Sequence, residues 1–205
     1  DVQKQLQKSV NNALSGYTEK DKNGIYKAQA SGTCIDNDTG KVVAIVGGRE
    51  QKNIGYTLNR AYQSPRQPGS AIKPLLVYAP ALEHGWSAGS TVNDSPMASN
   101  DKHRVRNSHG SYSGQISLRR AVQKSSNVAT MRIYEQLTPK TCLKYLEEMN
   151  FKYLTDSDYK YYTTCIGGFT KGTTSEEMAA GYATLKNDGV YREPTCISKI
   201  TTSDG

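Results

Sequence analysis

Ser70 and Lys73 stand three residues apart, directly after Pro68-Gly69 and at the start of a long apolar run. The Pro-Gly pair breaks the chain there, which predicts that Ser70 lies at or near a helix N-terminus, where unpaired N–H groups and the helix dipole favour negative charge. Lys73 would share that helical face. In a partly dry pocket a lysine has a lowered pKa and can take a serine proton, which activates the serine as a nucleophile. Gly69 leaves room for a substrate to approach.

A second polar cluster, Ser125-Ser126-Asn127, lies 55 residues beyond Ser70. Ser125 could relay a proton to a leaving amine, and the Asn127 amide can both donate to and accept from a peptide-like substrate. If the clusters form one site, Lys73 is expected within hydrogen-bond reach of both Ser70 and Ser125. Taken alone, each cluster also fits a plainer structure: a helix cap beside a solvated lysine, and an ordinary Ser/Asn loop.

The elements that must position these residues follow from apolar spacing and turn residues. Helices are expected over residues 2–14, 72–82, 116–123, 128–137, from 139 onward and 174–189. Pro80 is expected to kink its helix, and Thr174 with Glu177 to form a capping box. A hairpin is expected around the polar turn 36–40, and its second strand, 42–46, is apolar throughout, which predicts burial on both faces.

Two further stretches complete the pattern. Residues 92–113 are polar and loop-like, suited to lining an open cleft, and residues 190–200 have the composition of a strand. The order of helix, hairpin, many helices and strand predicts one mixed α+β or three-layer domain.

Composition excludes several classes of function. The 205 residues carry a net charge of +7, but no Lys/Arg-rich run of five appears, so we expect a solvated basic surface, suited to an anionic polymer such as a cell wall, and no nucleic-acid site. No apolar stretch approaches the 18 residues of a membrane span. The cysteines form no C-x-x-C pair and the histidines lack metal-ligand spacing, so free, buried thiols, no metal and no cofactor are expected. These residues are Cys34, Cys142, Cys165, Cys196, His84, His103 and His109.

Together the two clusters and their surroundings resemble a known family. The chain is similar to the penicillin-binding transpeptidase domain of bifunctional class A penicillin-binding proteins, whose motif set begins with S-x-x-K. The similarity runs from residue 2 to 205 and includes DTGKVVAIVGGR, NRAYQSPRQPGSAIKP, STVNDSP, SLRRAVQKSSNVATMRI and GGFTKGTTSEEMAAGYATLKNDGVYREP. This resemblance implies an α+β, penicillin-binding/serine β-lactamase-like fold, with an antiparallel sheet packed with helices.

The resemblance also implies roles. Ser70 would be the acylated nucleophile, Lys73 its general base, and Ser125 the group that passes a proton to the departing D-alanine. Asn127 would hold the peptide carbonyl and orient Lys73, and the Ser70 N–H would form half of the oxyanion hole. The implied partners are peptidoglycan stem peptides ending in D-Ala-D-Ala and β-lactam antibiotics. The parent protein would be anchored outside this chain, at the extracytoplasmic face of the bacterial cell membrane.

The third motif of the family, Lys-Thr-Gly, is absent from the sequence. Residues 170–174, Thr-Lys-Gly-Thr-Thr, have another order and precede an expected helix. We therefore expect residues 1–205 to be a partial transpeptidase domain, with the motif and the last sheet strands beyond Gly205, and to be inactive or impaired when alone. The alternatives are a non-catalytic β-lactam-binding or scaffold module and a serine β-lactamase, although no carboxylate motif for deacylation is visible.

Overall fold

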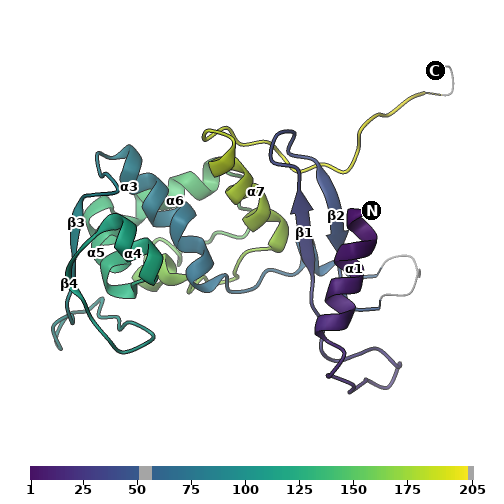
Figure 1. Ribbon diagram of the computed structural model, residues 1–205, viewed down its shortest axis with the longest axis horizontal. Coiled ribbons are helices and arrows are strands. Elements are labelled where there is room, and N and C mark those ends of the chain that lie inside the picture. The colour runs from purple at the N-terminus through teal and green to yellow at the C-terminus, as the bar shows by residue number, and fades with distance from the viewer. Residues whose placement is uncertain (51–56, 203–205) are drawn as a thin grey trace. The chain divides into compact units, whose positions relative to one another are not determined.

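The computed structural model of the chain describes residues 1–50 and 57–202 (Figure 1). Two compact units are distinguished: Asp1–Pro65 together with Thr174–Gly205, and Arg66–Thr173. The first unit contains α1 (Val2–Ala13), α2 (Arg60–Gln63), α7 (Ser175–Lys186) and the sheet formed by β1 (Gly32–Ile35) and β2 (Val42–Val46). The second unit contains the other helices and the sheet formed by β3 (Thr91–Asp94) and β4 (Gly114–Ser117). The fold is therefore α+β, as the sequence predicts.

Helix α1 (Val2–Ala13) forms because apolar residues recur four apart and Asp1 caps its first turn. The helix packs against β2 (Val42–Val46) (Figure 1). The side-chain amide of Gln3 bonds the strand backbone as another strand would: Nε2 donates to the Ile45 carbonyl at 3.0 Å, and the Ile45 N–H donates to Oε1 at 2.9 Å. The helix thus occupies part of the strand edge.

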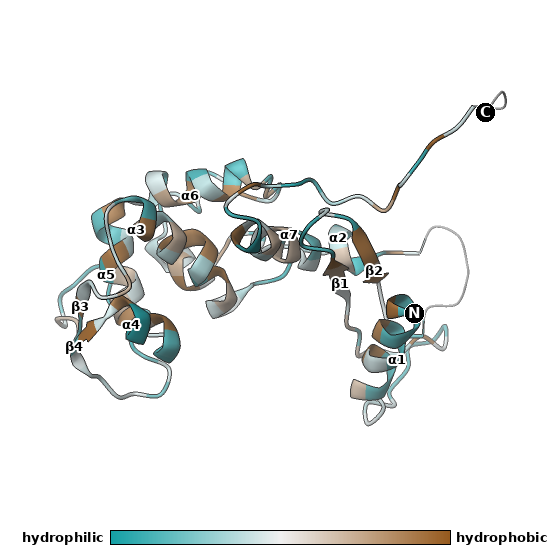
Figure 2. Cartoon of the chain, turned by 45° about the horizontal axis from the view of Figure 1, so that its top comes forward, coloured by the Kyte–Doolittle hydropathy of each residue, from teal (hydrophilic) through white to brown (hydrophobic). Residues whose placement is uncertain are grey.

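The hairpin of β1 (Gly32–Ile35) and β2 is antiparallel, as predicted. Asp36 holds the turn, since its Oδ1 accepts two N–H groups from the residues that follow. Figure 2 shows β2 hydrophobic along its length. The prediction that both its faces are buried is wrong: Ala44 is buried, but Val43 points to the other face and is 44% exposed.

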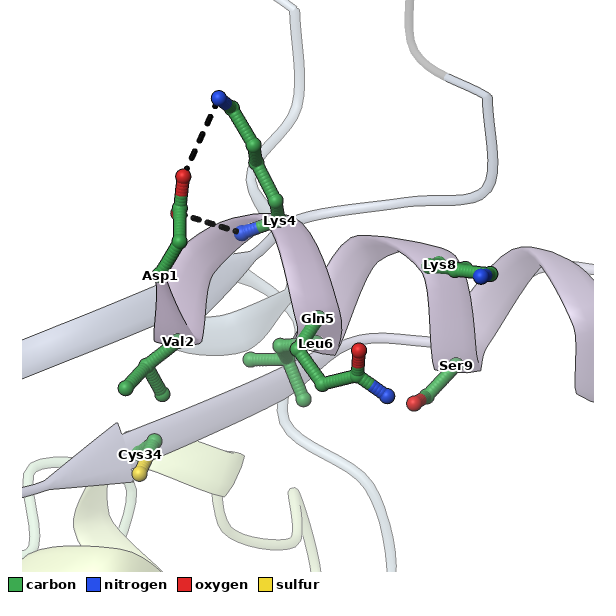
Figure 3. Close-up of a pocket in the computed structure, with 8 residues that line it drawn as sticks. All are labelled: Asp1, Val2, Lys4, Gln5, Leu6, Lys8, Ser9 and Cys34. Atoms are coloured by element: carbon green, nitrogen blue, oxygen red, sulfur yellow. Dashed lines mark hydrogen bonds and ion pairs between the residues drawn. The ribbon is translucent and has the colours of Figure 1, made fainter.

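A pocket of about 670 Å³ lies between α1 and β1 (Figure 3). It is lined by Asp1, Val2, Lys4, Gln5, Leu6, Lys8, Ser9 and Cys34. The charged pair in it, Asp1 and Lys4 at 3.1 Å, belongs to the helix cap. Cys34 is a free, half-buried thiol. The polar groups of this pocket serve the start of α1 and do not form a catalytic arrangement.

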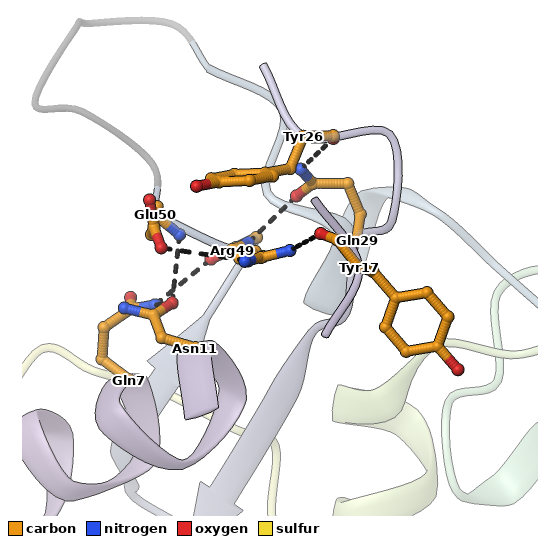
Figure 4. Close-up of polar contacts among 8 residues, drawn as sticks. Gln7, Asn11, Tyr17, Tyr26, Gln29, Arg49 and Glu50 are labelled. Carbon is orange, nitrogen blue, oxygen red and sulfur yellow. Dashed lines mark hydrogen bonds and ion pairs between the residues drawn. The ribbon is translucent and has the colours of Figure 1, made fainter. Parts of the chain in front are cut away.

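Arg49 anchors the connection between α1 and β1 (Figure 4). Its guanidinium lies 3.6 Å from the centre of the Tyr26 ring and donates to the Tyr17 carbonyl. Its backbone N–H donates to Gln29 Oε1 at 3.0 Å. Arg49 is only 5% exposed, so the cation–π contact and the bond to Tyr17 replace part of the water that the charge has lost, and the Glu50 carboxylate lies 3.9 Å from Nε. They fix the segment after α1 to the end of β2.

Helix α7 (Ser175–Lys186) begins at the predicted capping box, which is confirmed. Thr174 Oγ1 accepts from the Glu177 N–H at 3.1 Å, and Glu177 Oε2 accepts from the Thr174 N–H at 2.8 Å. The helix packs against β1 and against α2 (Arg60–Gln63).

The prediction of a strand over residues 190–200 is wrong. Within the described residues this segment makes one isolated parallel bridge, between Lys41 and Thr195, in which the Val42 N–H donates to the Thr195 carbonyl at 2.9 Å. Pro194 has no N–H to donate, so the ladder does not extend past it.

In the second unit, residues 69–83 form a helical run of three kinds. A 3₁₀ turn, η1 (Gly69–Ile72), leads into a π-helical turn, η2 (Pro74–Tyr78), and then into α3 (Ala79–Glu83). The kink predicted at Pro80 stays a prediction. The run changes from 3₁₀ to π at Pro74, which cannot donate into the preceding turn, and Pro80 directly follows the π turn as the second residue of α3.

The hydrophobic core of this unit lies where η2 packs against α5 (Asn127–Leu137) and α6 (Pro139–Glu148). Its fully buried members recur at helical spacing: Leu75, Leu76, Val128, Met131, Leu143 and Leu146. Burying each such side chain contributes about 1.5–3 kcal/mol. This packing holds the helical run that follows Ser70 against α5.

A second hairpin encloses the region expected to be a loop, residues 92–113: its first strand overlaps the start of that region, and its second strand follows directly after it. β3 (Thr91–Asp94) pairs antiparallel with β4 (Gly114–Ser117). Each strand has only four residues, too few for alternation to stand out in a polar stretch. Because Ile116 belongs to β4, α4 (Leu118–Lys124) begins two residues later than predicted.

Candidate active site

Lys73 is the centre of a buried polar cluster in the second unit. Only 1% of the residue is exposed. Its Nζ donates to the Ser125 carbonyl at 2.7 Å, to Ser125 Oγ at 3.3 Å and to Asn127 Oδ1 at 2.6 Å. An ammonium has three N–H donors, and these three acceptors satisfy all of them. The structure thus brings Lys73 together with the two outer residues of the Ser125-Ser126-Asn127 cluster.

Burial lowers the pKa of Lys73 to about 8, because water no longer solvates its charge. Cys165, buried on η3 (Tyr162–Ile166), is the other titratable group that acts on it. Burial raises the pKa of the Cys165 thiol well above its ordinary range, so this neighbour stays neutral. An amine with this pKa can both lose and take up a proton near neutral pH.

Ser125 lies at the junction of α4 and α5 in the left-handed region, with φ of +50°. A non-glycine residue in this region costs about 1–3 kcal/mol, and such strain clusters at functional sites. The next residue, Ser126, caps α5 by accepting the Ala129 N–H at 2.9 Å. The sharp junction points the Ser125 hydroxyl and the Asn127 amide at the same amine.

Ser70 is the second residue of the helical run, near its start as predicted, and is exposed. Gly69 before it has φ of +55°, which a side chain would strain. The contact expected between the Lys73 amine and Ser70 is not found: within the described chain no hydrogen bond joins Lys73 Nζ to Ser70 Oγ, and the Ser70 carbonyl accepts only the backbone N–H of Lys73. Catalytic hydrogen bonds often close only when substrate binds.

Sequence reasoning missed the segment that supports Ser70. The backbones of Gly167 and Gly69 touch so closely that a Cβ on Gly167 would lie 2.3 Å from Gly69. The Gln67 side chain bonds both backbone groups of Phe169, accepting its N–H at 2.7 Å and donating to its carbonyl. The glycines of G-G-F-T-K-G were the available signal, since glycine permits such an approach.

Among the described residues, one group outside this cluster has metal-ligand chemistry. Asp101, His103 and Glu135 each offer a ligand atom, and these atoms lie within 4.8 Å of one another. His103 already bonds Glu135 through Nδ1 at 2.8 Å and stacks on Tyr162 with ring centres 3.6 Å apart. A hydrogen bond and a ring contact therefore account for the position of His103.

This fold and this lysine–serine–asparagine cluster define a class of protein. The sequence pattern of the family described as "Penicillin binding protein transpeptidase domain" matches residues 30–204. The chain belongs to this family.

The particular relatives that the chain matches are penicillin-binding proteins, among them several named penicillin-binding protein 1A. The chain is 35% identical to "Penicillin-binding protein 1A" of Clostridium perfringens strain 13 over 201 residues, which is 91% of this chain and 29% of that protein. It is also 35% identical to "Penicillin-binding protein 4" of Bacillus subtilis over 178 residues, which is 86% of this chain and 28% of that protein. The match is thus to the transpeptidase domain of class A penicillin-binding proteins, and the chain spans under a third of these relatives.

Solved structures agree on the fold. Penicillin-binding protein 1A from Haemophilus influenzae matches with a TM-score of 0.70 and 30% identity, over 86% of this chain and 27% of that one. PonA1 from Mycobacterium tuberculosis, solved in complex with penicillin V, matches with a TM-score of 0.72 and 22% identity, over 93% of this chain and 51% of that one. Among the described residues, no helix has the length and apolar character needed to cross a bilayer.

Proposed function

We propose that the chain is part of a peptidoglycan D,D-transpeptidase domain that cross-links stem peptides through an acyl-enzyme on Ser70 and is inhibited by β-lactams. The observation that carries this proposal is Lys73, a buried lysine with a pKa of about 8, held by Ser125 and Asn127 three residues after an exposed serine. Membership of the transpeptidase family and the complex of PonA1 with penicillin V support the choice of substrate and inhibitor.

In the proposed acylation, neutral Lys73 takes the hydroxyl proton of Ser70. The Ser70 oxygen attacks the carbonyl of the penultimate D-alanine and forms a C–O bond, and the Ser70 N–H stabilises the oxyanion. Ser125 then gives its proton to the nitrogen of the terminal D-alanine and regains one from Lys73. The C–N bond breaks and free D-alanine leaves.

In the proposed transfer, an amine of a neighbouring stem peptide attacks the acyl carbon. A new C–N bond forms, its proton passes through the Ser125 and Lys73 pair, and Ser70 leaves with a proton restored. At pH 7 a lysine with a pKa of about 8 is neutral in about one molecule in ten. This fraction of the protein holds Lys73 in the form that can accept the Ser70 proton. A β-lactam would acylate Ser70 in the same way, but its leaving nitrogen stays tethered by the ring.

We also propose that residues 1–205 alone acylate slowly. The sequence contains no Lys-Thr-Gly, the motif to which the family resemblance assigns the second oxyanion donor and a carboxylate partner. One lost oxyanion donor lowers a rate by about 10²–10³-fold. Acylation of residues 1–205 at the rate of the full-length gene product would contradict this proposal.

The parent protein is proposed to act at the extracytoplasmic face of the bacterial membrane, where its substrate lies.

The test supplies the full-length gene product with a stem peptide that ends in D-Ala-D-Ala and with an acceptor amine. Free D-alanine and the cross-linked peptide are measured, and Ser70→Ala is the matched control. The proposal expects both products from the wild type and neither from Ser70→Ala. Cross-linking that survives in Ser70→Ala would contradict it, and rapid release of an acyl group from penicillin would indicate a β-lactamase instead.

A further inference from the structure

Asn107 lies in the irregular stretch between β3 and β4 and is only 4% exposed. Its Oδ1 accepts the backbone N–H of Asn127 at 2.9 Å and that of Val128 at 3.2 Å. These two N–H groups belong to the first turn of α5 and have no partner within the helix. Ser126, the residue at the N-cap, reaches the N–H of Ala129 instead. Asn107 therefore caps α5 from a distant part of the chain.

Asp94, the last residue of β3, fixes the orientation of Asn107. Asp94 is only 1% exposed. Its Oδ1 accepts from Asn107 Nδ2 at 2.8 Å and from Ser126 Oγ. Its Oδ2 accepts the Ser113 N–H at 3.1 Å. Asn107 Nδ2 also donates to the Ser111 carbonyl at 3.0 Å. A carboxylate can only accept, so it selects the NH₂ end of the Asn107 amide. The oxygen is thereby left facing α5.

This network leads directly to the catalytic cluster. Asn127 Nδ2 donates to the Arg106 carbonyl at 2.8 Å, and Asn127 Oδ1 accepts from Lys73 Nζ at 2.6 Å. The backbone and the side chain of Asn127 are thus bound by consecutive residues of one loop. Loss of the Asn107 oxygen would free two N–H groups and release the turn that carries Asn127.

We propose that Asn107, oriented by Asp94, is a positioning residue that keeps Asn127 Oδ1 against Lys73 Nζ. This inference rests on the proposed function, in which Lys73 is the base. Asn107 touches no reacting atom and acts through Asn127. Because a hydrogen bond to the charged form favours that form, moving Asn127 away should lower the pKa of Lys73. The other titratable group that faces Lys73, the buried thiol of Cys165, stays neutral and does not mask this change.

The test compares the wild-type full-length gene product with Asn107→Ala, Asn107→Asp and Asn107→Asp combined with Asp94→Asn. Val46→Ala, buried on β2 in the first compact unit, controls for loss of stability alone. Two quantities are measured against pH: the second-order rate constant of acylation by a fluorescent penicillin, and the lysine side-chain NMR signal of Lys73.

The proposal expects Asn107→Ala to acylate about 10- to 100-fold more slowly per folded molecule, and both pH midpoints to move down. Asn107→Asp places two carboxylates together and should be slower still. Adding Asp94→Asn restores a donor between these two positions and should recover part of the rate, while Val46→Ala should leave both midpoints unchanged.

The proposal would be overturned if Asn107→Ala kept the wild-type rate constant and the wild-type NMR midpoint, or if Val46→Ala moved them equally. The NMR titration needs no penicillin and decides the question even if acylation is not seen. A wild-type protein that fails to acylate would count against the proposed function and not against the positioning role. Should Asn107→Asp fail to fold, Asn107→Ala and the double variant still decide it.

Discussion

The rate of acylation should follow the titration of Lys73. Burial lowers the pKa of this amine to about 8, and only its neutral form can take the Ser70 proton. With that pKa, the neutral fraction is about 0.1 at pH 7 and about 0.9 at pH 9, so the rate constant should rise about 10-fold and then level off. An ordinary lysine, with a pKa near 10.4, would give a rise of about 100-fold over the same interval without levelling.

The assay measures the second-order rate constant for a fluorescent penicillin from pH 6 to pH 10, because that constant reports the pKa of the free enzyme. Ser70→Ala at each pH supplies the background labelling. Lys73→Arg keeps a positive charge but cannot become neutral, so it should abolish the pH-dependent reaction. A flat profile, a rise that continues past pH 10, or acylation by Lys73→Arg within a few-fold of the wild type would refute Lys73 as the base.

Two further predictions concern stability. The difference in free energy of unfolding between the wild type and Lys73→Met should rise by about 2.5 kcal/mol from pH 8 to 10.5, because in that interval the unfolded state holds more of the Lys73 proton than the folded state does. Urea unfolding at the two pH values measures this rise, and a constant difference would contradict the lowered pKa of the buried amine. Gly167→Ala should lose at least about 1–3 kcal/mol and slow acylation, because its φ is +97° and the new Cβ would lie 2.3 Å from the Gly69 backbone. Gly16→Ala, which meets nothing within 4 Å, should be near neutral, and equal behaviour of the two variants in thermal unfolding would argue against the close contact.

Local patterns in the sequence predicted much of the fold. The capping box of Thr174 and Glu177, the Asp36 turn and the start of α6 after Thr138 depend on residues a few positions apart, so composition and spacing are sufficient to find them. The S-x-x-K spacing and the neighbouring blocks likewise indicated the family, because its chemistry requires these residue types together.

The features that were missed depend on contacts between distant residues. β3 and β4 are short strands defined only by their pairing, and nothing in the sequence of 92–113 reveals a partner. The contact of Gly167 with Gly69 and the capping of α5 by Asn107 join segments far apart in the chain. Burial of Val43 failed as a prediction because an apolar run does not specify which face a helix will cover.

The measurement that tests the central claim most directly is the position of the covalent adduct. The full-length gene product is incubated with a fluorescent penicillin, digested, and mapped by peptide mass. The account predicts a single labelled serine, Ser70, in the wild type, and loss of the label in Ser70→Ala and Lys73→Arg. A label on Ser125 or Ser126, or labelling that persists in Ser70→Ala, would contradict the assignment of nucleophile and base.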